Sequence, residues 1–454
     1  MTSILLLKLW LPGGYEMMAD EEEQNAATIV RIGVNGDVSE LSAMTLVQEI
    51  RTMLSSHGHG DIHVEVHRTK VEFRGFPRHL VDNPAGDDRA FRIPHQLGVG
   101  VDIARISQTA SIGSGGIFLK LEGSDTTYLL TNQHVLDSSN TACRPFGSAD
   151  QEGELVVQMS DMSLENGLKK IRSEISGLDE EHTAQMRTIM SSAASERDIA
   201  RAEGKLDDAS NKRLQLLELL EWLERHWTDT ESRVIGKVAC YPQIANNLAA
   251  YPPITTEINP GARAGMTPAQ RASLQGFALD WGLIEIDPIG LDGLGSPNVL
   301  RILDYDWVKS TSLRFTFQPN VVRERAVRIA GVAPYADFAS LAKRVTKLGA
   351  ASGHTVGTVS PAIGALGISA GTSPNGTPIF AETPTFVLPI FGDGGKPFSA
   401  KGDSGSVAID DRGMAVAHIF GGEKINGEDV TFSTPMEFVF QDIKEFCGLS
   451  PSLA

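Results

Sequence analysis

The sequence predicts a mainly β protein with a helical insertion. Its 454 residues include 45 glycines and 22 prolines, a composition typical of many turns between short strands. From Ile106 onwards, short apolar strings alternate with Gly- and Ser-rich turns, which is the pattern of consecutive strands. Between residues 162 and 228 this pattern is broken, and apolar side chains recur at helical spacing instead.

The first 105 residues predict a tail, a small folded unit and a linker. Residues 1–25 contain an acidic run and are expected to be disordered. Over 26–76, a β-branched string, a helical period and an alternating string predict a β-α-β unit. Residues 77–105, rich in Pro, Asp, Arg and Gly, predict a linker. The apolar string Ile4–Leu11 is far shorter than the about 20 residues that cross a bilayer, and it lacks the features of a secretory signal.

Two apolar runs within 162–228 predict an antiparallel helical hairpin. They step by four and three residues, the spacing of a two-helix seam, at Leu164, Leu168, Ile171, Ile175 and Leu178, and again at Leu216, Leu220, Leu223 and Trp227. Gly204 is the expected break between the arms. The hairpin is either an insertion that packs on itself or a docking site for a partner protein.

The strand pattern around the insertion divides into two β-rich units, 106–290 and 291–454. A Pro- and Gly-rich connection separates them. The second unit ends in a helix from Thr434, where Thr434–Glu437 has the sequence of a capping box. One apolar face follows at Met436, Val439, Phe440, Ile443 and Phe446.

Charge and cysteine content restrict the partners and the compartment. The chain has 40 Lys and Arg against 57 Asp and Glu, a formal net charge of −17, which argues against nucleic acid or an anionic membrane as a partner. Its three cysteines are few and far apart, so we expect a reducing, cytoplasmic setting rather than a disulfide framework. The cluster His57, His59, His63 and His67 lacks a well-placed acidic or Cys ligand, and we expect neither a metal nor a cofactor.

Three short strings carry the residue types of nucleophilic catalysis. His134 directly follows an apolar strand, Asp280 stands at the start of an alternating strand, and Ser404 lies in a Gly-flanked turn. Serine is a poor nucleophile unless a neutral imidazole takes its proton and a carboxylate orients that imidazole. The glycines allow the N–H groups of Gly402 and Ser404 to converge where an oxyanion would develop.

These strings, in the order His, Asp, Ser, resemble the chymotrypsin/trypsin-like serine protease family in its disulfide-poor form. Val345–Val359 is similar to the hairpin that opens the inner strands of that family's second barrel, and His418–Gly422 to the strand that pairs with the substrate backbone. The resemblance covers about Ile106 to Cys447. It implies two antiparallel six-stranded β-barrels, with the helical hairpin as an insertion and the small α/β unit in front.

The resemblance also implies a role for each site residue in hydrolysis of a protein or peptide substrate. Ser404 would be the nucleophile, His134 the general base and then acid, Asp280 the orienting carboxylate, and the amides of Gly402 and Ser404 the oxyanion hole. Substrate would lie against Phe398, Ser399, Ile419, Phe420 and Gly421, and Ala400 is expected beside this set. No acidic residue stands at 398–400, so a preference for Lys or Arg is not expected, and an apolar or small side chain fits better.

Some features depart from the family pattern and leave a second interpretation open. Gln133 replaces a small residue, Ser406 replaces the usual glycine, and no activation start of the Ile-Val-Gly-Gly type precedes the first barrel. In secreted relatives a newly cut amino terminus pairs with the residue equivalent to Asp403, and the sequence offers no evident substitute. The alternatives are an inactive protease-fold scaffold that recruits partners through the helical insertion, or a protease that is inactive until a partner clears its cleft.

Overall fold

A computed structural model describes most of the β-rich part of the chain and shorter pieces before it. The described residues are 2–5, 29–34, 40–56, 58–60, 62–68, 72–73, 98–109, 111–137, 143–147, 153–191, 195–242, 276–287, 297–301, 322–323, 326–339, 341–366, 369–372, 378–380, 385–425 and 428–454.

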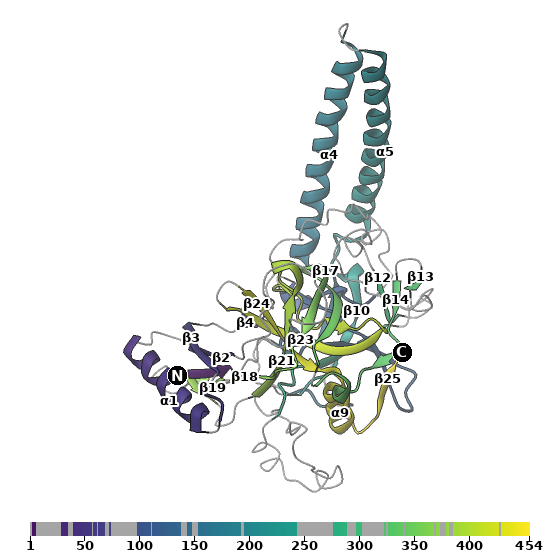
Figure 1. Ribbon diagram of the computed structural model, residues 1–454. Coiled ribbons are helices and arrows are strands. Elements are labelled where there is room, and N and C mark those ends of the chain that lie inside the picture. Colours follow the sequence, from purple (N-terminus) through teal and green to yellow (C-terminus); the bar gives the residue numbers. More distant parts are fainter. Residues whose placement is uncertain are drawn as a thin grey trace.

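Six strands in the C-terminal half close into a barrel (Figure 1). They are β16 (Lys343–Gly349), β17 (Gly353–Val359), β21 (Thr385–Gly392), β24 (Glu428–Pro435), β23 (Met414–Ile425) and β22 (Val407–Ile409). Each strand pairs antiparallel with the next, and β22 returns to β16 through Ile409 and Thr346. The interior includes the fully buried Val345, Ile390 and Phe398. One of the two expected six-stranded barrels is therefore confirmed.

The other β unit is a curled sheet of eight strands, ordered β25-β7-β8-β11-β10-β9-β5-β6. Its strands are β5 (Asp102–Arg105), β6 (Gly113–Ser114), β7 (Phe118–Leu121), β8 (Thr127–Thr131), β9 (Leu155–Gln158), β10 (Val234–Cys240), β11 (Gly282–Ile286) and β25 (Pro451–Leu453).

The two ends of this sheet's strand order approach each other at the segment between β6 and β7. The amide of Gly115 donates to the carbonyl of Val101, and that of Gly116 donates to the carbonyl of Leu130, both at 2.7 Å. A Cβ on Gly116 would lie 2.6 Å from the carbonyl oxygen of Gly405, so the second unit reaches the sheet at this break. The closed barrel expected over 106–290 is thus a curled half-barrel, interrupted where the two units touch.

A shared core joins the two β units beneath helix α9 (Met436–Cys447). It includes Trp281, Val407, Met436 and Ile443, all fully buried, and the Trp281 indole N–H donates to Asp442 Oδ2 at 2.6 Å. The helix is present as expected, but the capping box is not. No side chain caps its first turn, and the Glu437 carboxylate instead accepts a hydrogen bond from the amide of Tyr335 at 2.7 Å.

The helical insertion is an antiparallel hairpin of α4 (Asp161–Ile189) and α5 (Glu196–His226), which projects away from the β units (Figure 1). Its seam contains most of the expected residues in buried positions: Leu164, Leu168, Ile171, Ile175, Leu178, Leu216, Leu223 and Trp227. The expected break at Gly204 is wrong, because this glycine lies inside α5. The second arm begins at Ser195, whose side chain forms a capping box with Asp198.

The N-terminal pieces contain the expected β-α-β arrangement. β2 (Ile29–Val34) and β3 (His63–Arg68) pair in parallel, with α1 (Glu40–Ser56) between them. β1 (Thr2–Leu5) adds antiparallel to β2, so part of the expected tail 1–25 is a strand, because its backbone completes the edge of β2. Most of the expected linker 77–105 lies outside the described residues, but its end forms β5, where Ile103 and Ala104 are buried.

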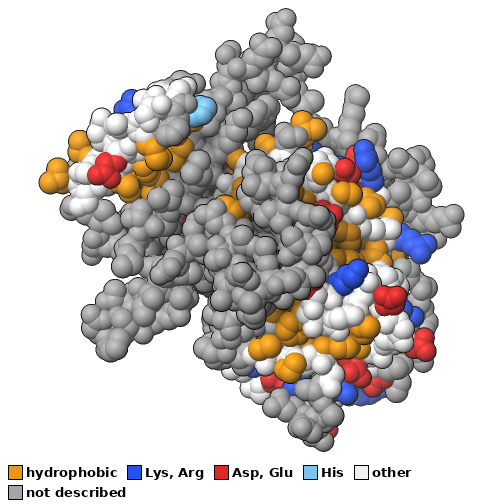
Figure 2. Space-filling view, turned by 90° about the horizontal axis from the view of Figure 1, so that it is seen from below, with side chains coloured by type: hydrophobic (Ala, Val, Ile, Leu, Met, Phe, Trp, Pro, Cys, Tyr) orange, Lys and Arg blue, Asp and Glu red, His pale blue; other side chains and the backbone are white. Residues whose placement is uncertain are grey.

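The remaining described strands are short. They are β4 (Glu72–Phe73), β12 (Val299–Arg301), β13 (Val322–Arg323), β14 (Ala326–Arg328), β15 (Gly331–Val332), β18 (Gly364–Leu366), β19 (Ser369–Thr372) and β20 (Pro378–Phe380). Among all the residues that the structure describes, no helix is both long and apolar enough to cross a membrane. Seen from below, acidic and basic side chains are interspersed on the described face (Figure 2).

Candidate active site

Strand register brings His134 and Asp280 to one end of the curled sheet. His134 lies in the short helix α3 (Gln133–Leu136), which follows β8, and Asp280 precedes β11 by two residues. β8 and β11 are antiparallel partners, with Thr131 opposite Gly282. The end of one strand therefore meets the start of the other, and both side chains emerge there.

The Asp280 carboxylate contacts His134 with both of its oxygens, one at the ring and one at the backbone. Oδ2 hydrogen-bonds to Nδ1 of the ring, and Oδ1 accepts from the His134 amide at 3.2 Å. The side-chain amide of Asn132 donates to the Asp280 carbonyl and fixes the backbone there. Both Asp280 and His134 are buried. Because Nδ1 faces the carboxylate, Nε2 is the ring nitrogen directed to the opposite side.

Ser404 lies in a tight turn that leads into β22. Gly402 and Gly405 adopt φ values of +102° and +96°, a region that L side chains rarely occupy. The Ser404 side chain is fully buried, and its hydroxyl donates to the Phe420 carbonyl of β23 at 3.3 Å.

Ser114 of the curled sheet fastens this turn from the other side. Its amide donates to the Ser404 carbonyl at 2.7 Å, and its hydroxyl donates to the Gly402 carbonyl at 2.9 Å. A Cβ on Gly405 would lie 2.1 Å from the Ser114 carbonyl oxygen and 2.4 Å from Oγ1 of Thr131. The Ser404 turn is therefore packed against the strand that ends three residues before His134.

Asp403, next to Ser404, is a fully buried carboxylate with several donors. Oδ1 accepts from the amides of Ala351 and Ser352 at 2.9 and 3.0 Å, and Oδ2 accepts from the Ala400 amide at 2.8 Å. The ammonium of Lys347 lies 3.0 Å from Oδ2. Burial by itself would raise the pKa of Asp403, but Lys347, the Ser352 hydroxyl and these amides hold that pKa below its usual 3.8.

His418 is a second buried histidine near this pair. It lies on β23 opposite Val407, and both Asp280 and His134 influence its protonation. Burial lowers the pKa of His418 to about 4, although the Asp280 carboxylate acts in the opposite direction. Among the described residues its Nε2 has no hydrogen-bond partner. His418 is therefore neutral at physiological pH.

The residues expected to contact substrate are mostly buried. Phe398 lies in the interior of the closed barrel, with Lys347 Nζ 5.7 Å from its ring centroid. The hydroxyls of Ser399 and Thr431 are 2.6 Å apart. Ile419 packs inside the barrel, whereas Phe420 packs in a separate buried cluster with Val387 and Phe432 and offers its carbonyl to Ser404. Their side chains support the barrel, so the backbone of this strand is what faces the Ser404 turn.

Gly421, the last of these residues, lies where another segment of the chain joins the barrel. β4 pairs antiparallel with β23, with Phe73 opposite Gly421 and Glu72 opposite Gly422. This pairing begins one residue after the carbonyl that contacts Ser404. The edge of β23 beside the candidate nucleophile thus already holds an extended segment.

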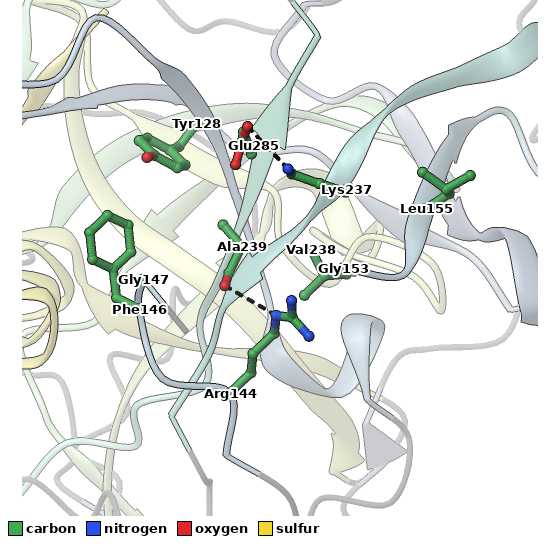
Figure 3. Close-up of a pocket in the computed structure, with 10 residues that line it drawn as sticks. All are labelled: Tyr128, Arg144, Phe146, Gly147, Gly153, Leu155, Lys237, Val238, Ala239 and Glu285. Atoms are coloured by element: carbon green, nitrogen blue, oxygen red, sulfur yellow. Dashed lines mark hydrogen bonds and ion pairs between the residues drawn. The ribbon is translucent and has the colours of Figure 1, made fainter. Parts of the chain in front are cut away.

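A separate surface hollow of about 420 Å³ lies on the outer side of the curled sheet, over β8, β10 and β11 (Figure 3). An ion pair between Lys237 and Glu285, 3.5 Å long, lies on one side, and Arg144 Nε donates to the Ala239 carbonyl at 3.2 Å. None of the expected site residues lines it. Across the described ranges, no group of three His, Cys, Asp or Glu side chains is placed to hold a metal.

Comparisons with known proteins give little beyond this geometry. No protein-family model matches the chain, and no curated protein matches it. One similar solved structure is Rv3671c from M. tuberculosis H37Rv, as a serine-to-alanine mutant in an inactive form. The identity is 12%, the similarity covers 82% of this chain and 97% of that chain, and the TM-score is 0.28. At that TM-score the similarity supports no inference about activity.

Sequence reasoning missed four residues that shape the site: Lys347, Ser114, Asn132 and His418. Asn132 and His418 lie inside the strings that identified His134 and the candidate substrate strand. Lys347 lies on the same face of β16 as the buried Val345 and Gly349, which is an unusual place for a lysine. A buried position inside a strand was the signal that could have marked it.

Proposed function

We propose that the chain is a trypsin-like serine endopeptidase that hydrolyses peptide bonds through an acyl-enzyme. The observation that carries this proposal is the hydrogen bond between His134 Nδ1 and Asp280 Oδ2. It presents Nε2 towards the other side of the ring, which is the arrangement a serine nucleophile needs. The curled sheet and the closed barrel would correspond to the family's two barrels, with the site at their shared edge.

In this mechanism His134 Nε2 takes the Ser404 hydroxyl proton as Oγ attacks the substrate carbonyl carbon. The Asp280 carboxylate stabilises the imidazolium that forms. The amides of Gly402 and Ser404 donate to the developing oxyanion, within a turn already fixed by Ser114 and Asp403. His134 then gives the proton to the leaving amine as the peptide C–N bond breaks. Water next attacks the acyl carbon while His134 takes a proton from it, and His134 returns that proton to Ser404 Oγ as the acyl–oxygen bond breaks.

Substrate would bind as an extended strand along β23. Gly421 and Gly422 already accept the backbone of β4, so this edge is suited to antiparallel addition of a peptide. Ile419, Phe420 and Gly421 would align the peptide, and Phe398 and Ser399 would form the base of the pocket for the side chain at the cleaved bond. With no acidic residue at 398–400, an apolar or small side chain is the expected occupant.

A reducing compartment is part of the same proposal. Cys240 and Cys447 have their Sγ atoms 3.9 Å apart, well beyond a disulfide bond, and the contact with the Cys447 thiol together with burial raises the pKa of Cys240. The proposed enzyme uses no metal or cofactor.

Active-site labelling tests the proposal. A fluorophosphonate probe should label the wild-type protein covalently, and should not label Ser404→Ala or His134→Ala. Ser433→Ala is the matched control, because Ser433 is a buried serine of the same barrel whose hydroxyl donates to the Leu388 carbonyl at 2.8 Å. This control should label at the wild-type rate.

The alternative is a non-catalytic scaffold that binds partners through α4 and α5. The projecting hairpin favours it, because Met186, Met190 and Leu214 are exposed on its arms. Two results together would favour the scaffold over the enzyme. Folded wild-type protein would not be labelled by the fluorophosphonate, and a bound partner protein would be lost when these three residues are exchanged for Gln.

A further inference from the structure

Lys347 places an ammonium group inside the barrel, beside the candidate nucleophile turn. The side chains of Lys347 and Asp403 both have 0% of their surface exposed, and Nζ lies 3.0 Å from Oδ2 of Asp403. Nζ also donates to Oγ of Ser352 at 2.6 Å. Lysine is almost never fully buried unless it is paired, so the location of this charge is tied to its partner.

The Asp403 carboxylate connects the Ser404 turn to the segment that follows β16. It accepts the amides of Ala351 and Ser352 from that segment, and the amide of Ala400 from the start of its own turn. The backbone of Asp403 also closes the turn, since its amide donates to the Ala400 carbonyl and its carbonyl accepts from the Ser406 amide, both at 3.0 Å. The orientation of this carboxylate therefore fixes the backbone on both sides of Ser404.

The surrounding backbone leaves room for the ion pair. A Cβ on Gly349 would lie 2.4 Å from Oδ1 of Asp403 and 2.9 Å from Nζ of Lys347. Any other residue at 349 would push the two charges out of place. Three positions therefore make the ion pair possible: Lys347 supplies the ammonium, Asp403 supplies the carboxylate, and Gly349 leaves space for both.

We propose that Lys347 is a positioning residue for the oxyanion hole, and that its ammonium holds the Gly402–Ser404 turn in its working shape within the uncut chain. This inference rests on the proposed endopeptidase function. The donors to the Asp403 carboxylate are Lys347, the Ser352 hydroxyl and nearby backbone amides, all from the uncut chain. The turn therefore requires no newly cut amino terminus as the partner of Asp403. Lys347 does not touch the substrate, and it acts through Asp403.

The charge of Lys347 matters more than its volume. Without the ammonium, Asp403 would be a buried carboxylate lacking its countercharge, which is strongly unfavourable. The carboxylate would then turn away or take up a proton, and the amides that flank Ser404 would move with it. Oxyanion donors must stay within 2.7–3.1 Å of the oxyanion position, so a small movement lowers the rate of the chemical step rather than substrate affinity.

The test compares two lysines of the same strand. In Lys347→Met we expect kcat for a peptide substrate, and the rate of fluorophosphonate labelling, to fall about 100-fold while KM stays within about threefold. The matched control is Lys343→Met, because Lys343 pairs with the buried Asp410 at 2.9 Å, away from Ser404. The control should lower the melting temperature and leave kcat within about twofold of wild type.

A milder variant covers the case in which Lys347→Met does not fold. Ser352→Ala removes one hydroxyl that joins Lys347 to Asp403 and should lower kcat about tenfold. The inference would be overturned if Lys347→Met folds and has the kcat of wild type. If Lys347→Met does not fold, a folded Ser352→Ala with the kcat of wild type would overturn it. Absence of Ser404 labelling in the wild-type protein would instead overturn the proposed function, and the inference with it.

Discussion

Nδ1 of His134 hydrogen-bonds to Oδ2 of Asp280, although the two residues stand 146 positions apart in the chain. Asp280→Asn would replace the oxygen that fixes the imidazole with an amide, and the ring would lose both its tautomer and its counter-ion. We expect the labelling rate of Ser404 and kcat to fall about 10³- to 10⁴-fold, with little change in the melting temperature. Glu285→Gln, an exposed-face change on the same strand β11, is the control and should retain full activity. A folded Asp280→Asn protein with normal labelling would contradict the assignment.

Gly405 lies at the point where the two β units touch. In Gly405→Ala the new methyl group would lie 2.1 Å from the Ser114 carbonyl oxygen, in a backbone region with φ of +96°. We expect a loss of more than about 2 kcal/mol in the free energy of unfolding, and loss of labelling even below the melting temperature. Gly123→Ala is the matched control, since Gly123 has φ of +76° but nothing within 4 Å of the added atom, and should cost about 1 kcal/mol. Equal destabilisation by the two variants would disprove the steric argument.

Glu423 predicts a pH dependence of stability. Its side chain is buried, Oε2 has no hydrogen-bond partner among the described residues, and burial raises the pKa of Glu423 from 4.5 to about 7. The folded protein therefore holds this proton more tightly than the unfolded chain. The stability that comes from the tighter binding of this proton is fully present below about pH 4.5. It is lost as the pH rises through about 7.

Glu423→Gln should remove that dependence, because the amide stays neutral at every pH. Between pH 5 and pH 8, urea unfolding should show the wild-type protein losing up to about 3 kcal/mol relative to the variant. Glu445→Gln, an exposed change on α9, should follow the wild-type curve. Parallel curves for wild type and Glu423→Gln would show that Glu423 titrates normally in the folded protein.

The pairing of β4 with β23 predicts competition with substrate. Glu72 and Phe73 pair with the backbone edge at which a peptide would bind, so the two segments exclude each other. In Glu72→Pro/Phe73→Pro the amides needed for this pairing are absent, and we expect KM for a peptide substrate to fall about 5- to 10-fold. Glu72→Ala/Phe73→Ala keeps the amides and should retain the wild-type KM. If the alanine variant lowers KM as much as the proline variant, backbone pairing is not the cause.

Local patterns in the sequence predicted the elements better than the contacts between them. The four-and-three spacing located the hairpin seam, because helical period directly determines which side chains face the partner arm. The turn between the arms lies before Ser195, whose capping box starts α5, and a helix of 31 residues tolerates the cost of about 1 kcal/mol of Gly204 in its interior.

Long-range charge pairing was the main feature that local patterns could not supply. The contact between Lys347 and Asp403 joins strand β16 to the turn before β22, which is distant in sequence, and neither residue type signals the other. His134 and Asp280 were recognised only because each stands in a characteristic local string. The sequence also predicts a closed barrel for 106–290 where the structure has a curled half-barrel, because nothing local to Gly116 shows that the second unit approaches there.

The hairpin leaves and re-enters the curled sheet at adjacent strands. α4 begins after β9, α5 returns to β10, and the two strands pair directly through Val157 and Val234. Arg233, buried at the base, contacts Asp161 and holds the arms at this point. Equal numbers of turns can therefore be cut from or added to both arms without altering the sheet register, so this position is a natural grafting point for fused reporters or binding modules.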